Sequence, residues 1–387
     1  MSLLPGRKAT YIGGSQYRRN AYGSNHPLAI PRVSLATQLI ESYAALSRTE
    51  FVLARKAADF ELQWFHTAEY IAAFKRAEAL GRVSNPVRQR HKLGTLENPY
   101  FDQFFTIPAT ATGASIQAAE QVIQGRIAFN PAGGMHHARA DSAEGFCYFN
   151  DTVLAVMRLR REGWRVLYVD IDAHHGDGVE AAFLDDPDVF TLSLHMDSRY
   201  AYPFQGGQLS DRTAASLNVP LPKDTNDAEY RLLFNTVWQP ILARFKADAV
   251  VLQAGTDMIF ADPLGKLGLT TQGFLSIAQT IIETSPQHAD GTPRLLVTGG
   301  GGYHPLVLAR AWTGLWALLS GRELPEALPP AGAAALRAVN WDLDEEEPYF
   351  EQLFCSRLDE LSGTSVRPEI DALILSLQQH PVFIQNS

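Results

Sequence analysis

Five short apolar runs along the chain each end at a group of polar or glycine residues, and segments with the spacing of an amphipathic helix lie between them. Such an alternation is typical of βα units, in which crossover helices join parallel strands. The predicted strands are residues 127–129, 166–169, 189–194, 249–252 and 295–297. The pattern therefore predicts an α/β fold with a central, mainly parallel sheet flanked by helices.

The helix predicted between the first two of these strands has a clear beginning and end. Asn150 and Asp151 precede apolar residues at helical spacing, and Gly163 follows them. Similar spacing predicts helices over residues 114–123, 230–245, 274–282 and 306–319. Ligands of open parallel sheets bind in the crevice beyond the carboxyl ends of the strands. The polar groups that follow the five strands should therefore line one crevice.

The chain contains no internal repeat and no long low-complexity linker that would divide it. A segment rich in proline and alanine covers residues 321–335, and an acidic run follows at 342–347. This change of composition predicts a main catalytic unit over residues 1–320 and a C-terminal extension over residues 321–387. We expect the extension to pack on the same single large domain.

The composition narrows the class of protein further. Apolar residues make up 46% of the 387 positions and charged residues 19%, which is typical of a globular protein. Cys147 and Cys355 are too few for a disulfide framework, so a cytoplasmic setting is expected. No apolar run is long enough to predict a signal peptide or a membrane span. The net charge of −9 and the brevity of the basic clusters argue against nucleic acid as a partner.

Polar residues that are costly to bury are concentrated in the stretch VDIDAHHGDG, residues 169–178. Asp170 and Asp172 should point to the same side of the strand end, where two unpaired carboxylates would repel each other unless a cation lay beside them. Asp172, His174 and the distant Asp257 would form a set of three oxygen and nitrogen ligands. Three protein ligands and an open position are typical of catalytic zinc. The alternative is that Asp170 caps a turn and the histidines form hydrogen bonds in the core.

Two further motifs suggest groups for proton transfer. His136 and His137 have the residue type for general acid–base catalysis near neutral pH, and each would need a carboxylate to fix its tautomer, for which Asp170 and Asp177 are candidates. The glycine run 299–302 lacks the signature of a phosphate-binding loop. We expect it to let the backbone pass close to a ligand and to present Tyr303 as a hydrogen-bond donor to an oxyanion. A purely structural tyrosine is the alternative.

Taken together, these motifs resemble the histone deacetylase superfamily, within the arginase/deacetylase fold. The resemblance runs from about residue 25 to 319, and GTLENP at 94–99 and GGGGYHPLVLARAW at 299–312 are similar to the bacterial acetoin-utilisation branch. The stretches that carry the resemblance are GGMHHARADSAEGFCYFND (133–151), YVDIDAHHGDGVEAAF (168–183), TLSLH (191–195), LQAGTDMIFADPLG (252–265) and GGGGYHP (299–305).

The resemblance implies a role for each matching residue. It implies one zinc ion, a histidine pair backed by two carboxylates, and a tyrosine that polarises the acyl carbonyl. The implied zinc ligands are Asp172, His174 and Asp257, and the implied catalytic residues are His136 with Asp170, His137 with Asp177, and Tyr303. Family members also bind structural potassium; the matching ligands are Asp170, Asp172, His174, Ser193 and Leu194, with a second site at Phe183 and Val189. The implied substrate channel comprises Gly145, Phe146, Tyr202 and Leu264, and Arg32 matches an arginine of the cavity through which acetate leaves.

The rim of the implied channel departs from the family pattern. Tyr202 stands where many members have phenylalanine, the segment 203–208 differs from the usual glycine-rich turn, and Glu97 or Asn98 is nearest to an expected rim aspartate. The implied activity is zinc-dependent hydrolysis of acetyl groups from amines such as acetyl-lysine. The alternatives are deacetylation of acetylpolyamines or other small acylated amines, and an acyl-lysine binder without catalysis. A binuclear ureohydrolase would need a second carboxylate beside Asp257, and the next acid is Asp262.

Overall fold

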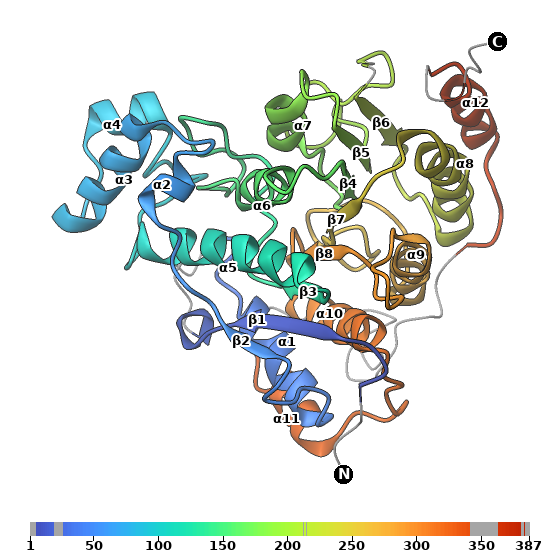
Figure 1. Cartoon of the computed structure of the whole chain (residues 1–387), viewed down its shortest axis with the longest axis horizontal. Coiled ribbons are helices and arrows are strands. Elements are labelled where there is room, and N and C mark those ends of the chain that lie inside the picture. Colours follow the sequence, from blue (N-terminus) through green and yellow to red (C-terminus); the bar gives the residue numbers. More distant parts are fainter. Residues whose placement is uncertain are drawn as a thin grey trace.

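The computed structural model describes residues 5–18, 26–211, 213, 215–340, 363–380 and 383. Within these residues the centre of the molecule is an eight-stranded sheet in the order β2-β1-β3-β8-β7-β4-β5-β6, and every pair of neighbouring strands is parallel (Figure 1). The strands are β1 (Ala9–Gly13), β2 (Phe51–Leu53), β3 (Ile127–Asn130), β4 (Val166–Asp170), β5 (Val189–Met196), β6 (Ser216–Leu221), β7 (Ala249–Gln253) and β8 (Leu295–Thr298). The predicted α/β class and parallel sheet are confirmed.

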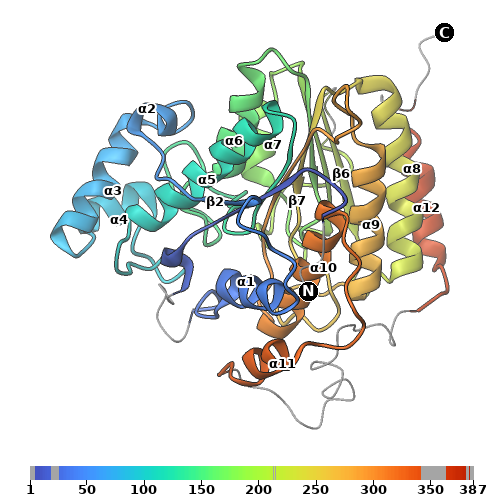
Figure 2. The ribbon, with the colours of Figure 1, turned by 60° about the horizontal axis from the view of Figure 1, so that its bottom comes forward.

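Helices cover both faces of the sheet. Side chains of β4 alternate between the two layers: Leu167 and Val169 pack in the larger core cluster, while Val166 and Tyr168 pack in the other. On the first face lie α1 (Arg32–Ser42), α8 (Asp227–Phe245), α9 (Thr271–Thr284), α10 (Pro305–Ser320), α11 (Pro330–Arg337) and α12 (Pro368–Leu377); on the second lie α5 (Thr106–Ile123), α6 (Asp151–Arg160) and α7 (Asp177–Phe183). Figure 2 shows α8 between α9 and α12.

An aromatic cluster extends the second layer beyond the sheet. It packs α3 (Ala68–Leu80) against α5 and includes residues from α2 (Asp59–Leu62), with α4 (Asn85–His91) alongside. Phe74 lies at its centre, with its ring 4.6 Å from that of Phe104 and 5.0 Å from that of Phe149. Tyr148 and Phe149, which follow the first histidine motif, belong to this cluster, so the cluster supports the chain just after that motif.

The five predicted strands and the five predicted helices are all present. The helix predicted over residues 114–123 begins earlier, at Thr106, because burial against the sheet outweighs the weak helix propensity of its threonine, proline and glycine residues. Gly113 allows this close packing, since a Cβ there would lie 2.1 Å from the carbonyl oxygen of Arg55. The predictions missed β1, β2 and β6, which lie toward the two edges of the sheet.

The C-terminal segment contacts the domain through α12. The Arg367 guanidinium binds both carboxylate oxygens of Glu229 at 2.7 Å, and Nε2 of His380 lies 3.0 Å from the carbonyl oxygen of Ser216 at the edge of the sheet. The division of the chain at residue 320 stays a prediction. Cys355 and the acidic run 342–347 lie outside the described residues. No helix in the described ranges has the length and apolar character needed to cross a membrane.

Candidate active site

The ends of β3, β4, β7 and β8 meet at the centre of one sheet edge, because these strands are neighbours in the sheet. The loop after each strand carries one of the predicted motifs: His136 after β3, Asp172 after β4, Asp257 after β7 and Tyr303 after β8. These four motifs therefore lie together at the strand ends, where the sequence predicts a crevice.

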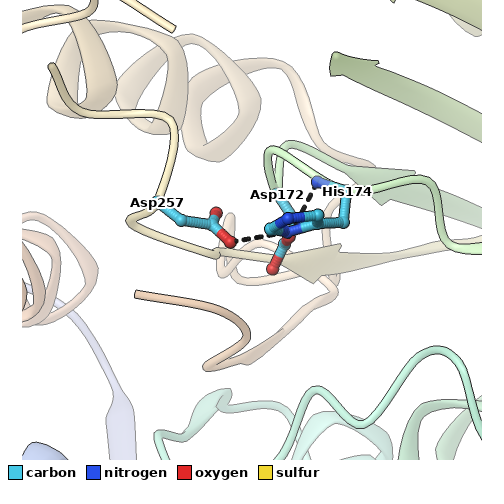
Figure 3. A group of neighbouring side chains, drawn as sticks. All are labelled: Asp172, His174 and Asp257. Carbon is cyan, nitrogen blue, oxygen red and sulfur yellow. Dashed lines mark hydrogen bonds and ion pairs between the residues drawn. The ribbon is translucent and has the colours of Figure 1, made fainter. Parts of the chain in front are cut away.

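Asp172, His174 and Asp257 form the one group in the described part of the chain whose ligand atoms could hold a metal ion, all lying within 4.8 Å of one another (Figure 3). Nδ1 of His174 lies 2.9 Å from an oxygen of Asp257 and 3.2 Å from an oxygen of Asp172. All three side chains are buried. Burial, and then the charge of Asp172, raise the pKa of Asp257. A cation at this point would relieve both effects, so the donor set fits zinc.

Backbone amides hold the two carboxylates in place. Gly301 N–H donates to Asp172 at 2.6 Å, and Ala173 N–H donates to Asp257 at 2.9 Å. A Cβ on Gly301 would lie 2.0 Å from an Asp257 oxygen, so only glycine fits. The glycine run therefore passes directly against the predicted ligand set.

The histidine pair lies beside this group, and each ring has its own carboxylate. Nδ1 of His136 lies 2.8 Å from Asp170, and Nδ1 of His137 lies 2.7 Å from Asp177. Burial lowers the pKa of His136, but the negative charges of Asp170 and of the nearby ligand group outweigh it and raise that pKa to about 9. Burial and the charge of His136 lower the pKa of His137 to about 3. His137 is therefore the neutral ring, as a proton acceptor must be.

Tyr303 faces the same space. Its ring centroid lies 6.4 Å from that of His174 and 6.1 Å from that of Phe146. A cavity of about 20 Å³, enough for one water molecule, is lined by Tyr303, both histidines of the pair and Asp172. Burial raises the pKa of Tyr303 well above its usual range, which keeps the phenol protonated and able to donate a hydrogen bond.

Three of the four predicted channel residues surround His137 and Tyr303. The Tyr202 ring lies 4.7 Å from that of His137, and a Cβ on Gly145 would lie 2.5 Å from His137 and 2.6 Å from Tyr202. Phe146 packs beside Tyr303, as described above. Leu264 is 39% exposed and lies in the loop after β7. The Gly145 N–H donates to the Glu97 carboxylate at 3.1 Å, whereas Asn98 is buried. Of the two candidates for the rim residue, Glu97 is thus the one that contacts the channel.

Arg32 lies at the boundary between two cavities. A second, mainly apolar cavity of about 110 Å³ shares Leu28, Arg32 and Met135 with the cavity beside Tyr303. The Arg32 guanidinium donates to the carbonyl oxygen of Gly300 and lies 5.4 Å from the centroid of the Trp312 ring. The arginine that the resemblance assigns to an inner cavity is therefore placed next to one.

The residues predicted to bind potassium come from two neighbouring strand ends. Asp170 pairs in register with Ser193 of β5, and Leu194 follows it. Asp172 N–H donates to an Asp170 oxygen at 3.0 Å, while Ser193 Oγ lies 2.8 Å from Nδ1 of His195. Phe183 and Val189 share one apolar cluster. Potassium at either place stays a prediction.

Three residues that position the motifs were missed as such by the sequence analysis. Asp151, expected only to begin a helix, is buried and accepts the N–H groups of Gly134 and Met135 at 3.0 and 2.8 Å. Arg139 binds the Asp177 carboxylate and donates to the Asp177 carbonyl oxygen at 3.0 Å. Asp262 binds backbone N–H groups, so it does not supply the second carboxylate that a binuclear centre needs. Each is a single charged residue, which has no periodicity by which a sequence pattern could mark it.

Comparison with known proteins assigns the class. The histone deacetylase domain family matches residues 26–319, so the chain belongs to that family of zinc-dependent deacetylases, which are hydrolases. It is 37% identical over 335 residues to histone deacetylase 8 of Xenopus tropicalis, covering 85% of this chain and 87% of that protein.

The chain is also similar to a bacterial member and to solved structures. It is 32% identical over 333 residues to acetoin utilization protein AcuC of Bacillus subtilis (strain 168), covering 84% of this chain and 85% of that protein. The crystal structure of a histone deacetylase homologue from Aquifex aeolicus is 37% identical, with a TM-score of 0.89 over 96% of this chain and 100% of the other. A second structure, of a homologue complexed with SAHA, matches with the same values. The expected superfamily, its acetoin-utilisation-type branch and the fold are confirmed.

Proposed function

We propose that this chain removes acetyl groups from acetyl-lysine or from small acylated amines, with one zinc ion held by Asp172, His174 and Asp257. The observation that carries the proposal is one shared cavity: Asp172 of the ligand set, both histidines of the pair and the phenol of Tyr303 line it, and the other two ligands lie beside Asp172. When bound, zinc polarises the acyl carbonyl and lowers the pKa of water toward about 7.

The side chains of the chain itself then supply the proton transfers. His137, neutral and held by Asp177 at 2.7 Å, accepts the proton of the attacking water and later gives a proton to the leaving amine. The Tyr303 hydroxyl donates a hydrogen bond to the oxygen on which negative charge develops. His136 and Asp170 act beside them as a charged, hydrogen-bonded pair.

The channel and the inner cavity complete the proposal. Phe146 and Tyr202 flank the alkyl chain that carries the acetylated nitrogen, as apolar and aromatic side chains do in ligand pockets. The cavity beside Arg32 offers the released acetate a positive charge next to the cavity of Tyr303. The negatively charged Glu97 at the channel suits a substrate with a second positive charge, which favours an acetylpolyamine as the second candidate.

A panel of substrates tests the function. Acetyl-lysine peptides, acetylpolyamines and small acetamides would be compared with the zinc-loaded protein by release of acetate. We expect turnover of at least one class, and the order of kcat/KM identifies the substrate. Tight binding of acetyl-lysine peptides without release of acetate from any member would instead support the non-catalytic alternative.

Tyr303→Phe tests the part played by the phenol. Removing one oxyanion donor should lower kcat by about 10²- to 10³-fold. Zinc content, measured by elemental analysis, should stay at one ion per chain because Tyr303 is not a ligand in this proposal. Wild-type rates of acetate release from Tyr303→Phe would contradict the role given to Tyr303.

A further inference from the structure

Asp262 is a buried acid whose carboxylate accepts hydrogen bonds from backbone N–H groups of the active-site loops. It lies in the loop after β7, five residues beyond Asp257, and only 4% of its surface is exposed. One oxygen accepts the N–H of Tyr303 at 2.6 Å. The other accepts the N–H groups of Leu264 and Gly265 at 2.9 and 3.1 Å. One side chain thus joins the loop after β7 to the loop after β8.

The segment that carries Tyr303 needs such an anchor. Residues 299–304 have no regular secondary structure, and Gly300 and Gly302 have φ angles of +139° and +131°. A run of glycines has the greatest freedom to move when it is not held. Gly301 is fixed through its N–H to Asp172 and through its carbonyl oxygen to Thr256. The backbone of Tyr303 itself is held by the bond that its N–H donates to Asp262.

We propose that Asp262 is a positioning residue for the deacetylation reaction, and that it acts by holding the Tyr303 backbone so that the phenol stays directed at the acyl carbonyl. The inference rests on the proposed function of Tyr303. The same carboxylate fixes Leu264, one wall of the predicted channel, so the channel wall and the donor keep one relative position. A misplacement of about 1 Å in such a group costs on the order of 10²-fold in rate.

Asp262→Asn changes this anchor with little change of shape. The amide keeps one acceptor oxygen, and its NH2 group cannot accept the N–H on the other side. With the full-length zinc-loaded enzyme, we expect kcat to fall by about 10- to 100-fold. KM should stay within about threefold, because the remaining amide oxygen can keep the bonds to Leu264 and Gly265 and so hold the channel wall. Zinc content should not change, because the proposed zinc ligands are untouched.

A double-mutant cycle with Tyr303→Phe separates positioning from a general structural role. The effects of two substitutions are not additive when the residues interact. If Asp262 acts through the phenol, adding Asp262→Asn to Tyr303→Phe should therefore lower the already reduced kcat by less than about a further twofold. Equal fold losses in both backgrounds would overturn the proposal. So would a wild-type kcat for Asp262→Asn.

Asp227→Asn is the matched control. Asp227 clamps a loop in the same manner, accepting the N–H of Thr270 at 2.8 Å and its hydroxyl at 2.7 Å, but at the start of α8. We expect this variant to lose stability while keeping its kcat. A loss of kcat as large as that of Asp262→Asn would show that any broken loop clamp has this effect, and would overturn the special role of Asp262.

A structural measurement keeps the inference testable apart from turnover. Crystal structures of the wild type and Asp262→Asn should differ in the position of the Tyr303 side chain, and an unmoved Tyr303 would overturn the proposal. Asp262→Ser, which retains one short acceptor, replaces Asp262→Asn if the latter does not fold. If the wild type releases no acetate from any substrate, the proposed function fails, and the position of Tyr303 still decides whether Asp262 anchors it.

Discussion

Two groups of buried charged residues in this molecule differ in the balance of positive and negative charge. Glu50 and Arg322 form a closed pair: both are at most 5% exposed, and the guanidinium donates to the two carboxylate oxygens at 2.7 Å each. In the candidate active site, two carboxylates, Asp172 and Asp257, converge on the single imidazole of His174. The first group is balanced within the chain, whereas the second has an excess of negative charge.

The difference separates a structural ion pair from a site that takes a ligand. Glu50 precedes β2 and Arg322 follows α10, so their pair ties together segments 272 residues apart without any further ion. A buried pair of this kind is complete, because each charge has its partner and its hydrogen bonds. The excess charge of the ligand group favours a cation. Four predictions test this contrast.

The largest effect is expected for Asp257→Asn, which removes one proposed ligand and keeps the shape of the side chain. Acetate release should fall below detection. Zinc at about 1,000 times its Kd should stabilise the wild type by about 4 kcal/mol, and the variant by much less. Thermal unfolding with and without zinc measures this. Full zinc content in the variant at limiting metal would remove Asp257 from the ligand set.

His137→Ala should separate chemistry from metal binding at the same site. Loss of the general base should lower kcat by roughly 10²- to 10⁴-fold. Zinc content and the unfolding midpoint of the zinc-loaded protein should change little, because the hydrogen bonds of His137 go to Asp177 and His136 rather than to a proposed ligand. Unchanged acetate release would contradict the role given to His137.

Arg322→Met should show that the balanced pair acts on stability alone. It leaves the buried carboxylate of Glu50 without a positively charged partner, which costs roughly 3–5 kcal/mol of unfolding free energy. The kcat of the folded fraction should equal that of the wild type. The double variant Glu50→Gln with Arg322→Met is the control, and it should recover much of the loss because no charge is left unpaired. Equal losses in the single and double variants would refute this account.

The smallest effect is the pH dependence of the same pair. Burial raises the pKa of Glu50, but hydrogen bonds from Arg322 and Ser47 outweigh it, and the pKa lies below its ordinary value of 4.5. A lowered pKa in the folded state means that the stabilisation is present above about pH 4.5 and is lost as the pH falls through the folded-state pKa. Urea unfolding between pH 7 and pH 3 should show a smaller loss for Glu50→Gln than for the wild type.

Much of the fold and of the candidate site could be predicted from local patterns. The strands at 166–170 and 249–253 were visible because buried parallel strands are continuous apolar runs. Of the two edge strands, β2 was missed because it has only three residues, and β6 because it contains Pro220, which is tolerated at an edge but weakens a strand pattern. The missed part of the site, Arg139 and Asp262, consists of single charged residues in loops, which have no periodicity to mark them.

The sequence by itself determined the alternation of strands and helices, the residue types at the strand ends and the family, because these depend on the spacing of neighbouring positions. Only the tertiary structure decided which strand ends meet. Asp257 reaches His174, 83 residues earlier, because β7 lies beside β4 in the sheet. The carboxylate of Asp262 reaches the backbone of Tyr303, 41 residues later, for a related reason: β8 lies beside β7. Sheet order results from the packing of the whole domain, and no local stretch of the chain encodes it.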